Sequence, residues 1–220
     1  MVKIALFDLD WTLIAGNSGW LLMKAECAGG HVSPWQACLA SGWMAAHRVG
    51  LVSMERGLLF AIAALEGKPA VEMEQRINAL YRDRVCALYR PAARRAIAAH
   101  QAAGHRTALL TSASGPLARL VARDLGIEEA GAIDFEVDGR GRYTGRPLGE
   151  MSVGRGKLQH AHRYVTALGC TMAQCTYYTD SHADRAVLEA VGYPVAVCPD
   201  GRLRRLARAR AWPILDWNGE

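Results

Sequence analysis

The hydrophobic positions near the N-terminus form one short run. Residues Ile4 to Phe7 are all apolar, and Leu9 continues the run between Asp8 and Asp10. A continuous apolar run of this length is typical of a parallel strand that is covered on both faces. We therefore expect a buried strand within the first ten residues that ends in an acidic turn.

A different pattern occupies residues 17–90, where apolar positions recur at helical spacing. One stretch shows this spacing at Met73, Ile77, Leu80, residue 84 or 85, and Leu88. Ser53 predicts the N-cap of a helix over residues 54–65, which Gly67 ends, and Ser33-Pro34 predicts another helix start. We expect four helices and no strand in this part of the chain.

From Pro91 onward the pattern alternates between helices and strands. Helices are predicted over residues 91–103, 116–125 and 157–168. Strands are predicted over residues 107–111, 176–179, 194–198 and 213–215, and a hairpin over 135–144. Repeated strand–helix units predict a parallel sheet with right-handed crossovers. We therefore predict an α/β core over residues 1–16 and 91–220, with residues 17–90 inserted after the first strand as a helical cap.

The first candidate for chemistry is the acidic turn after the first strand. Asp8 and Asp10 are two residues apart, so on an extended chain their side chains share a face. Two close carboxylates resist being ionised together unless a cation lies between them or one keeps its proton. The pair therefore suits a metal-assisted reaction with a nucleophile and an acid–base partner, and two solvated turn aspartates are the alternative.

Other polar side chains follow later predicted strands or open a predicted helix. They are Thr111, Ser112, Lys157, Asp180 and Asp184. Ligands of open parallel sheets bind at the carboxyl ends of the strands, so we expect these side chains to meet there. Each residue also has a structural alternative. Lys157 could be a solvated helix residue, Thr111 could simply end its strand, and the charge of Asp184 could only stabilise the N-terminus of a helix through the helix dipole.

Four segments together resemble the motifs of the haloacid dehalogenase superfamily. They are F-D-L-D-W-T-L, L-L-T-S, G-K and Y-T-D-S-x-x-D. The helical insert between the first two motifs is similar to that of C1-cap phosphatases, in particular phosphoserine phosphatase-like hydrolases, which include histidinol-phosphatase types. The resemblance covers essentially the whole chain, and it implies a Rossmann-like parallel core with an all-helical C1 cap.

The resemblance also implies a reaction, the hydrolysis of a phosphate monoester with Mg²⁺ as cofactor. Asp8 would attack phosphorus to form an aspartyl-phosphate, and Asp10 would act as general acid and then general base. Thr111 and Lys157 would hold phosphoryl oxygens. The implied Mg²⁺ ligands are Asp8, the backbone carbonyl of Asp10, Asp180 and, directly or through water, Asp184.

The substrate side departs from the family pattern. Phosphoserine phosphatases place a glutamate seven residues after the second aspartate, where this chain has Asn17. Trp11 stands at a position that is usually small or polar, where it either lines the pocket or packs against the cap linker. Our candidate substrate-binding residues are Asn17, Ser18, Trp11 and Ser112.

Several functions fit these residues. The leading expectation is hydrolysis of a small soluble metabolite phosphate such as histidinol phosphate. Asn17 better suits a neutral or apolar alcohol phosphate from a specialised-metabolite pathway. Two further functions fit as well. One is a phosphotransferase that passes the phosphoryl group to a second alcohol, and the other is a non-catalytic module that binds a phosphate ligand.

The composition indicates which kinds of partner the protein is expected to lack. Among the 220 residues, 26 Lys and Arg face 21 Asp and Glu, and five arginines crowd the predicted C-terminal helix at 202, 204, 205, 208 and 210. No aromatic residues interleave with a basic surface, so we expect no nucleic acid partner. The apolar run at residues 58–65 is far shorter than the ~20 residues of a membrane span.

The cysteines bear on the compartment. Six cysteines without a C-x-x-C pair predict buried free thiols in a reducing cytoplasm. We expect a cytoplasmic protein that binds a small phosphorylated metabolite, no membrane and no nucleic acid, as a monomer or homodimer.

Overall fold

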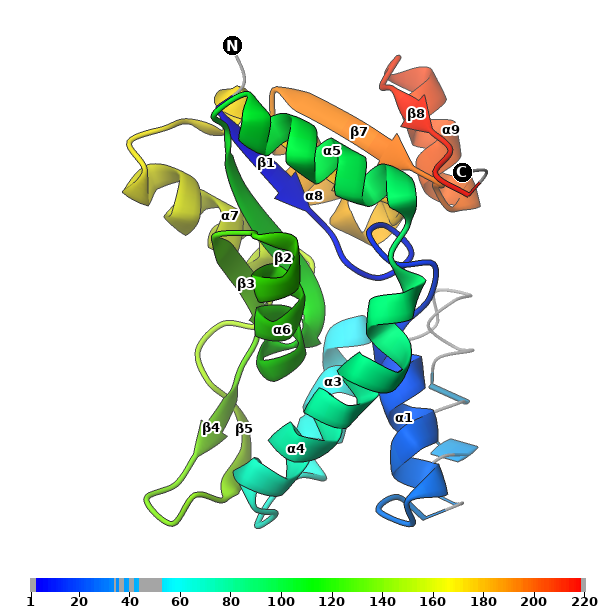
Figure 1. The fold of residues 1–220 in the computed structure, drawn as a ribbon, viewed down its shortest axis with the longest axis vertical. Helices are drawn as coiled ribbons and strands as arrows, with labels where there is room; N and C mark the ends of the chain where they lie inside the picture. The colour runs from blue at the N-terminus through cyan, green and yellow to red at the C-terminus, as the bar shows by residue number, and fades with distance from the viewer. Residues whose placement is uncertain (1–2, 34, 36–37, 40–41, 44–52, 219–220) are drawn as a thin grey trace.

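The centre of the molecule is a parallel sheet (Figure 1). The structure is a computed structural model that describes residues 3–33, 35, 38–39, 42–43 and 53–218. The sheet has the strand order β3-β2-β1-β6-β7-β8, and every neighbouring pair is parallel. The strands are β1 (Ile4–Phe7), β2 (Arg106–Ser114), β3 (Glu129–Ile133), β6 (Cys175–Thr179), β7 (Tyr193–Val197) and β8 (Ile214–Leu215). The predicted α/β class is confirmed.

The register of β1 decides which strand ends meet. Its last residue, Phe7, lies opposite Leu109 of β2 on one side and Tyr178 of β6 on the other. Because all three strands run in the same direction, the residues that follow these positions lie at one edge of the sheet. The loops after β1, β2 and β6 therefore share a common space.

Helices cover both faces of the sheet, as the alternation of side chains along β1 requires. Ala5 and Phe7 belong to a core cluster with residues of α5 (Pro91–Ala102) and α6 (Gly115–Leu125). Ile4 and Leu6 belong to a second cluster, which is completed by helices on the other face. Those helices are α7 (Arg155–Ala167), α8 (Arg185–Ala190) and α9 (Gly201–Ala209).

The segment after β1 contributes helices that lie below the core in the view of Figure 1. They are α1 (Ser18–Ala28), α3 (Met54–Ala63) and α4 (Ala70–Leu80), followed by the π-helical η1 (Tyr81–Val85) and the 3₁₀ turn η2 (Cys86–Leu88). Ser53 caps α3 as predicted, and its side chain accepts the amide of Arg56 at 3.3 Å. Most of the segment after the predicted helix start at Ser33-Pro34 lies outside the described residues.

The π turn explains an ambiguity in the hydrophobic spacing. Met73, Ile77 and Leu80 are buried at ordinary helical intervals, and the next buried position is Val85 rather than Arg84. A π turn inserts one extra residue, so the interval after Leu80 grows to five. The buried stripe thereby stays on one side of the helix.

A hairpin from the core joins these helices. It consists of β4 (Phe135–Val137) and β5 (Tyr143–Pro147), and so extends beyond the predicted 135–144. The amide of Gly67 donates to the Tyr143 carbonyl at 2.9 Å, and the Tyr143 amide donates to the carbonyl of Lys68 at 3.0 Å. Backbone hydrogen bonds therefore bind the hairpin to the segment between α3 and α4.

The edge strand β3 is absent from our sequence prediction. Its residues, Glu129 to Ile133, include an exposed glutamate and Gly131, both of which are uncommon in strands. A Cβ atom at Gly131 would lie 2.9 Å from Leu110 and 3.2 Å from His160. The glycine therefore allows α7 and β2 to approach closely, a tertiary requirement that local propensity does not reveal.

The cysteines agree with the sequence in chemistry but not in burial. All six are free thiols, as predicted. Only Cys175 is buried, however, and Cys38 is exposed, so the expectation of buried thiols was wrong for the others. Among the described residues, no helix combines the length and the apolar character needed to cross a bilayer.

An aromatic stack ties the C-terminal segment to the sheet. The rings of Phe7 and Tyr178 lie parallel with centroids 4.9 Å apart, and Trp217 stacks on Tyr178 at 5.7 Å. Only 6% of the Trp217 surface is accessible to solvent. The segment after β8 is therefore part of the core.

We expect Trp217→Ala to lower the free energy of unfolding by about 3 kcal/mol, because it removes a large buried side chain from this stack. Urea denaturation measures the loss. Leu215→Ala is the control, since Leu215 is 37% exposed and should lose less than about 1 kcal/mol. If Trp217→Ala lowered the free energy of unfolding no more than the control does, the segment after β8 would not be part of the core.

Candidate active site

The loop after β1 folds back on itself. The carbonyl of Leu9 accepts the amides of Leu13 at 2.9 Å and Ile14 at 3.1 Å, and the Trp11 amide donates to the Gly16 carbonyl at 2.9 Å. Trp11 has a φ of +59°, which is uncommon for a residue with a side chain. This turn keeps Asp8 at the strand end and carries Asp10 toward the start of α1.

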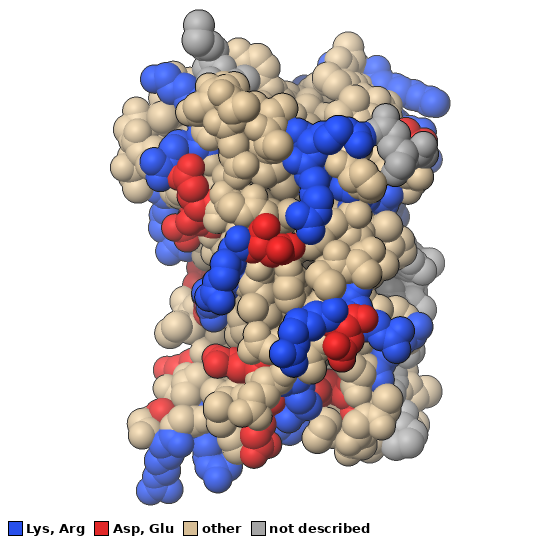
Figure 2. Space-filling view, viewed as in Figure 1, with Lys and Arg blue, Asp and Glu red and all other residues tan. Residues whose placement is uncertain are grey.

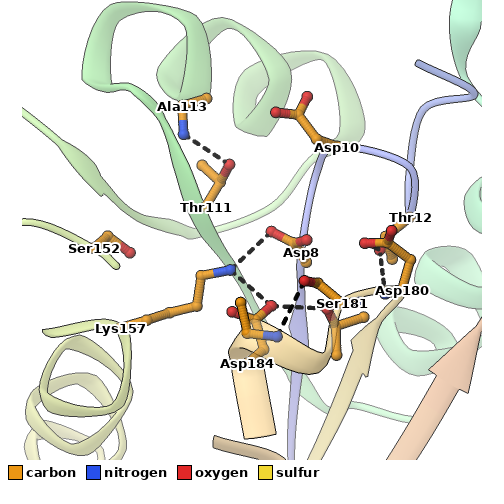
Figure 3. Close-up of polar contacts among 12 residues, drawn as sticks. Asp8, Asp10, Thr12, Thr111, Ala113, Ser152, Lys157, Asp180, Ser181 and Asp184 are labelled. Atoms are coloured by element: carbon orange, nitrogen blue, oxygen red, sulfur yellow. Dashed lines mark hydrogen bonds and ion pairs between the residues drawn. The ribbon is translucent and has the colours of Figure 1, made fainter. Parts of the chain in front are cut away.

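The centre of the site is a buried ion-pair cluster (Figure 3). Lys157 reaches from the first turn of α7, and its Nζ lies 3.0 Å from Asp8 Oδ1 and 2.9 Å from Asp184 Oδ2. All three residues are buried. A Cβ atom at Gly156 would lie 2.1 Å from the Met151 carbonyl, so only glycine fits the close turn that presents Lys157.

Asp184 is held by donors from three directions. Besides Lys157, its Oδ2 accepts the hydroxyl of Tyr177 at 2.7 Å and the hydroxyl of Thr179 at 2.7 Å. Lys157 also donates to the Tyr177 hydroxyl at 3.3 Å. Asp184 occupies the N-cap position of α8 but makes no side-chain capping bond there. Its carboxylate serves the Lys157 cluster instead.

Asp10 is held by a different part of the chain. Its Oδ1 accepts the backbone amide of Ser18 at 2.7 Å, and its Oδ2 accepts the side-chain amide of Asn17 at 3.4 Å. Both donors belong to the start of α1, which immediately follows the loop. The two aspartates of the first motif are therefore positioned by different elements, Asp8 by α7 and Asp10 by α1.

Asp180 follows β6 and is tied to the first loop. Its backbone amide donates to the Thr12 hydroxyl at 3.0 Å, and that hydroxyl donates to Asp180 Oδ1 at 3.4 Å. Its carbonyl accepts the amide of Asp200 at 2.8 Å. Thr12 thus fixes the loop after β6 against the loop after β1.

The remaining candidates lie around this group. Thr111 is buried on β2, and its hydroxyl accepts the Ala113 amide at 3.1 Å. Ser112 is half-buried, and Trp11 is 44% exposed. Ser18 is buried, and its hydroxyl has no hydrogen-bond partner among the described residues.

Burial raises the pKa values of the Asp8, Asp10 and Asp180 carboxyl groups. It raises the pKa of Asp8 to about 7, with Lys157 opposing the shift and Asp184 and Asp10 adding to it. Burial also raises the pKa of Asp180 to about 8, with further contributions from Asp8 and Asp184, and it raises the pKa of Asp10. Burial therefore opposes the ionisation of these three carboxyl groups, and neighbouring carboxylates add to it at Asp8 and Asp180.

The cation of the cluster stays charged. Burial by itself lowers the pKa of Lys157, but Asp184 and Asp8 outweigh it and raise the pKa above its usual value. Burial and the same two carboxylates also raise the pKa of Tyr177, so Tyr177 remains a phenol that donates its proton. Lys157 is thus a permanent positive charge between two carboxylates.

The donor set fits a divalent cation bound by oxygen. Within the described part of the chain, no three His, Cys, Asp or Glu side chains already surround one point. Two carboxylates, a backbone carbonyl and waters nevertheless suffice for a small hard cation. Asp8 and Asp180 supply such carboxylates, and the charge of Asp8 raises the pKa of Asp180, a repulsion that a cation relieves.

Sequence reasoning missed three residues of this arrangement. Tyr177 and Thr179 hold Asp184, and Thr12 joins two loops. A signal for the first two was present, because they are polar residues two apart in a buried strand and so share a face. No local signal indicates that Thr12 contacts residue 180.

The arginines predicted on the C-terminal helix are exposed. Arg202, Arg204, Arg205 and Arg208 face solvent on α9, and Leu203 and Ala207 are buried on its inner side. On the face of the molecule that Figure 2 shows, Lys and Arg lie interspersed with Asp and Glu. The excess positive charge of the chain is therefore not gathered into one patch on this face.

Comparisons with known proteins cover nearly all of this chain. The family model of haloacid dehalogenase-like hydrolases matches residues 5–189. A phosphoserine phosphatase of Mycobacterium tuberculosis is 32% identical over 224 residues, which is 99% of this chain and 71% of that protein. A histidinol-phosphatase of Neisseria meningitidis is 26% identical over 99% of this chain and 100% of that protein. The crystal structure of a Bordetella pertussis protein of unknown function matches with a TM-score of 0.86 and 29% identity, over 99% of this chain and 100% of that one.

We expect Lys157→Met to lower the free energy of unfolding by roughly 3 kcal/mol at pH 8 in a chelating buffer, because it leaves buried carboxylates without their cation. The pKa of Asp8 is raised above its unfolded value, so its buried charge reduces stability progressively as pH rises toward 7. Loss of Lys157 raises that pKa further, and the deficit should therefore be larger at pH 8 than at pH 5.5.

Urea denaturation at the two pH values measures the deficit. Lys3→Met is the matched control, because Lys3 is exposed and its loss should cost less than about 0.5 kcal/mol. Equal stability of Lys157→Met and the control at pH 8 would show that the cluster does not hold the site.

Proposed function

The chain belongs to the haloacid dehalogenase-like hydrolases and is a phosphatase, and we propose that Asp8 is the nucleophile that takes the phosphoryl group from a small metabolite phosphate. The observation that carries the proposal is the position of Asp8. It is buried at the end of the central strand, paired with Lys157 at 3.0 Å, and shares a loop with a second carboxyl group, Asp10. A nucleophile, a fixed positive charge and an acid are what phosphoryl transfer to a carboxylate requires.

In the first step, a carboxylate oxygen of Asp8 attacks phosphorus and the bond from phosphorus to the ester oxygen breaks. Asp10 transfers its proton to that oxygen, so the leaving group departs as an alcohol. Burial raises the pKa of Asp10, which favours the protonated form that this step needs. Lys157 and Thr111 hold the non-bridging phosphoryl oxygens.

In the second step, water attacks the phosphorus of the aspartyl-phosphate. Asp10, now ionised, accepts a proton from that water, the bond from phosphorus to Asp8 breaks, and inorganic phosphate is released. Asp8 regains its carboxylate and Asp10 its proton. The fixed positions of Asp8 and Asp10 on one loop allow the same acid to serve both steps.

We propose Mg²⁺ as the cofactor. Asp8, Asp180 and the Asp10 carbonyl would hold it, and Asp184 would act directly through Oδ1 or through water, since its Oδ2 already accepts three donors. When bound, the cation neutralises charge on the phosphoryl group and on the carboxylates around it. The oxygen-only donor set favours Mg²⁺ over softer metals.

We propose that residues 17–90 form the cap that recognises the leaving group. The segment begins at Asn17 and Ser18, which contact Asp10, and returns at Arg90, whose guanidinium donates to the Trp11 carbonyl at 3.3 Å. Trp11, Ser18 and Ser112 would contact the substrate between the core and this cap.

The absence of disulfides among the six cysteines supports the cytoplasm as the compartment.

Two substrate classes are supported by different observations. Histidinol phosphate is supported by the relative from Neisseria meningitidis, whose whole length aligns with this chain. A neutral alcohol phosphate is supported by Asn17, because no carboxylate stands at that position to bind an ammonium group. Phosphate release from a panel that contains histidinol phosphate, phosphoserine and neutral alkyl phosphates separates the two classes.

We expect Asp8→Asn to lower phosphate release by roughly 10⁴-fold or more, because an amide does not attack phosphorus and the nucleophile acts as part of a unit. Circular dichroism should show a folded protein. Asp124→Asn is the control, since Asp124 forms an exposed ion pair with Arg94. Turnover of Asp8→Asn within ten-fold of wild type would refute the proposed function.

We expect dialysis against a chelator to remove phosphate release, and Mg²⁺ to restore it. Ca²⁺ should restore much less, because it is larger and prefers more ligands than two carboxylates, a carbonyl and waters in an octahedron. Metal-free protein that turns over at the full rate would exclude the cofactor.

A further inference from the structure

The side chain of Asn17 makes two hydrogen bonds of opposite kind. Its Oδ1 accepts the backbone amide of Trp20 at 2.8 Å and so caps the N-terminus of α1. Its Nδ2 donates to Asp10 Oδ2 at 3.4 Å. One amide group thus joins the start of the cap segment to the second aspartate of the first motif.

The chemistry of the partners fixes the orientation of that amide. A backbone N–H requires an acceptor, and a carboxylate oxygen requires a donor. Asparagine offers both within one short side chain. A carboxylate at position 17 would cap the helix equally well but would repel the carboxylate of Asp10. A hydroxyl would also cap the helix, but it is shorter and lacks the separate NH₂ donor that contacts Asp10.

The two oxygens of Asp10 are held from the same side. Oδ1 accepts the Ser18 amide at 2.7 Å, and Oδ2 accepts Asn17 Nδ2. The Ser18 contact is made by a backbone N–H, which every residue type except proline supplies. The Asn17 contact depends on a particular side chain. Together with the Ser18 amide, it gives each oxygen of the Asp10 carboxyl group one hydrogen-bond donor.

We propose that Asn17 is a positioning residue, which orients the carboxyl group of Asp10 for proton transfer to the leaving alcohol. This inference rests on the proposed function of Asp10. Both ends of the Asn17 amide make hydrogen bonds within the protein, so a substrate ammonium would have to share Oδ1 with the Trp20 amide. We therefore assign Asn17 to the orientation of the acid rather than to the recognition of a cationic substrate.

The composition of the cap start agrees with this assignment. Between Asn17 and Met54 the sequence contains a single acidic residue, Glu26. Glu26 is buried, and its Oε1 accepts Arg76 Nε at 2.8 Å. This carboxylate is already neutralised, so the beginning of the cap offers no evident partner for a cationic leaving group.

The test compares two esters that differ in their need for a proton donor. The leaving group of a simple alkyl phosphate is a strongly basic alkoxide unless it is protonated. The leaving group of p-nitrophenyl phosphate is a stabilised phenolate that needs little protonation. Asn17→Ser keeps a good N-cap and removes the Nδ2 donor. In a single turnover, which isolates the first step, we expect the rate of alcohol release to fall roughly 10-fold to 100-fold on the alkyl ester and less than about 3-fold on the aryl ester.

Two control variants separate positioning from folding. Asn17→Ser should melt within about 2 °C of wild type, because serine caps as well as asparagine. Ser53→Ala removes the N-cap of α3 without touching Asp10, so it should lower the melting temperature but affect both esters equally. Weaker substrate binding in Asn17→Ser, with an unchanged single-turnover rate of alcohol release, would indicate a role in substrate recognition and would overturn the proposal.

Equal losses in the single-turnover rate of alcohol release on the two esters, or an unchanged rate on both, would also overturn it. These outcomes are distinguishable from failure of the proposed function, which Asp8→Asn tests separately. If Asp8→Asn is inactive and Asn17→Ser shows no dependence on the leaving group, only the positioning role is wrong.

Discussion

The structure depends on one buried cation, Lys157, held between the carboxylates of Asp8 and Asp184. Buried charges destabilise a protein unless they are paired and hydrogen-bonded, so this cluster constrains everything around it. Tyr177 and Thr179 complete the pairing by donating to Asp184. The central strand, the strand beside it and the start of α7 must therefore keep their relative positions. The same constraint fixes Asp8 in the position from which we propose that it attacks a phosphoryl group.

The two aspartates of the first motif are held by different parts of the molecule. Asp8 is held by the core through Lys157. Asp10 is held by Asn17 and Ser18 at the start of α1, which belongs to the segment that we propose as the cap. In the proposed mechanism, the position of the acid is therefore linked to the element that would contact the leaving group, whereas the position of the nucleophile is set by the core.

The sequence was sufficient for features that arise from local pattern, such as the buried strand before Asp8 and the carboxyl-end clustering of Lys157 and Asp184. Parallel strands in register bring such residues together whatever the details of packing. It was not sufficient where tertiary packing decides. Gly131 in the strand at Glu129–Ile133 allows a close approach of β2 and α7, and the hairpin, which the sequence does predict, is bound at Tyr143 to the segment between α3 and α4. Neither contact leaves a trace in local propensity.

We expect the carboxylate of Asp8 to carry the phosphoryl group during turnover. To trap this intermediate, the enzyme is quenched with acid during turnover of a phosphate ester and reduced with borohydride, and the product is located by peptide mass spectrometry. An aspartyl-phosphate is reduced to homoserine, whereas a free aspartate is unchanged. We expect homoserine at position 8 alone, in proportion to the enzyme engaged in turnover. An unmodified residue 8 under conditions of full turnover, or modification at another aspartate, would contradict the assignment of Asp8 as the nucleophile.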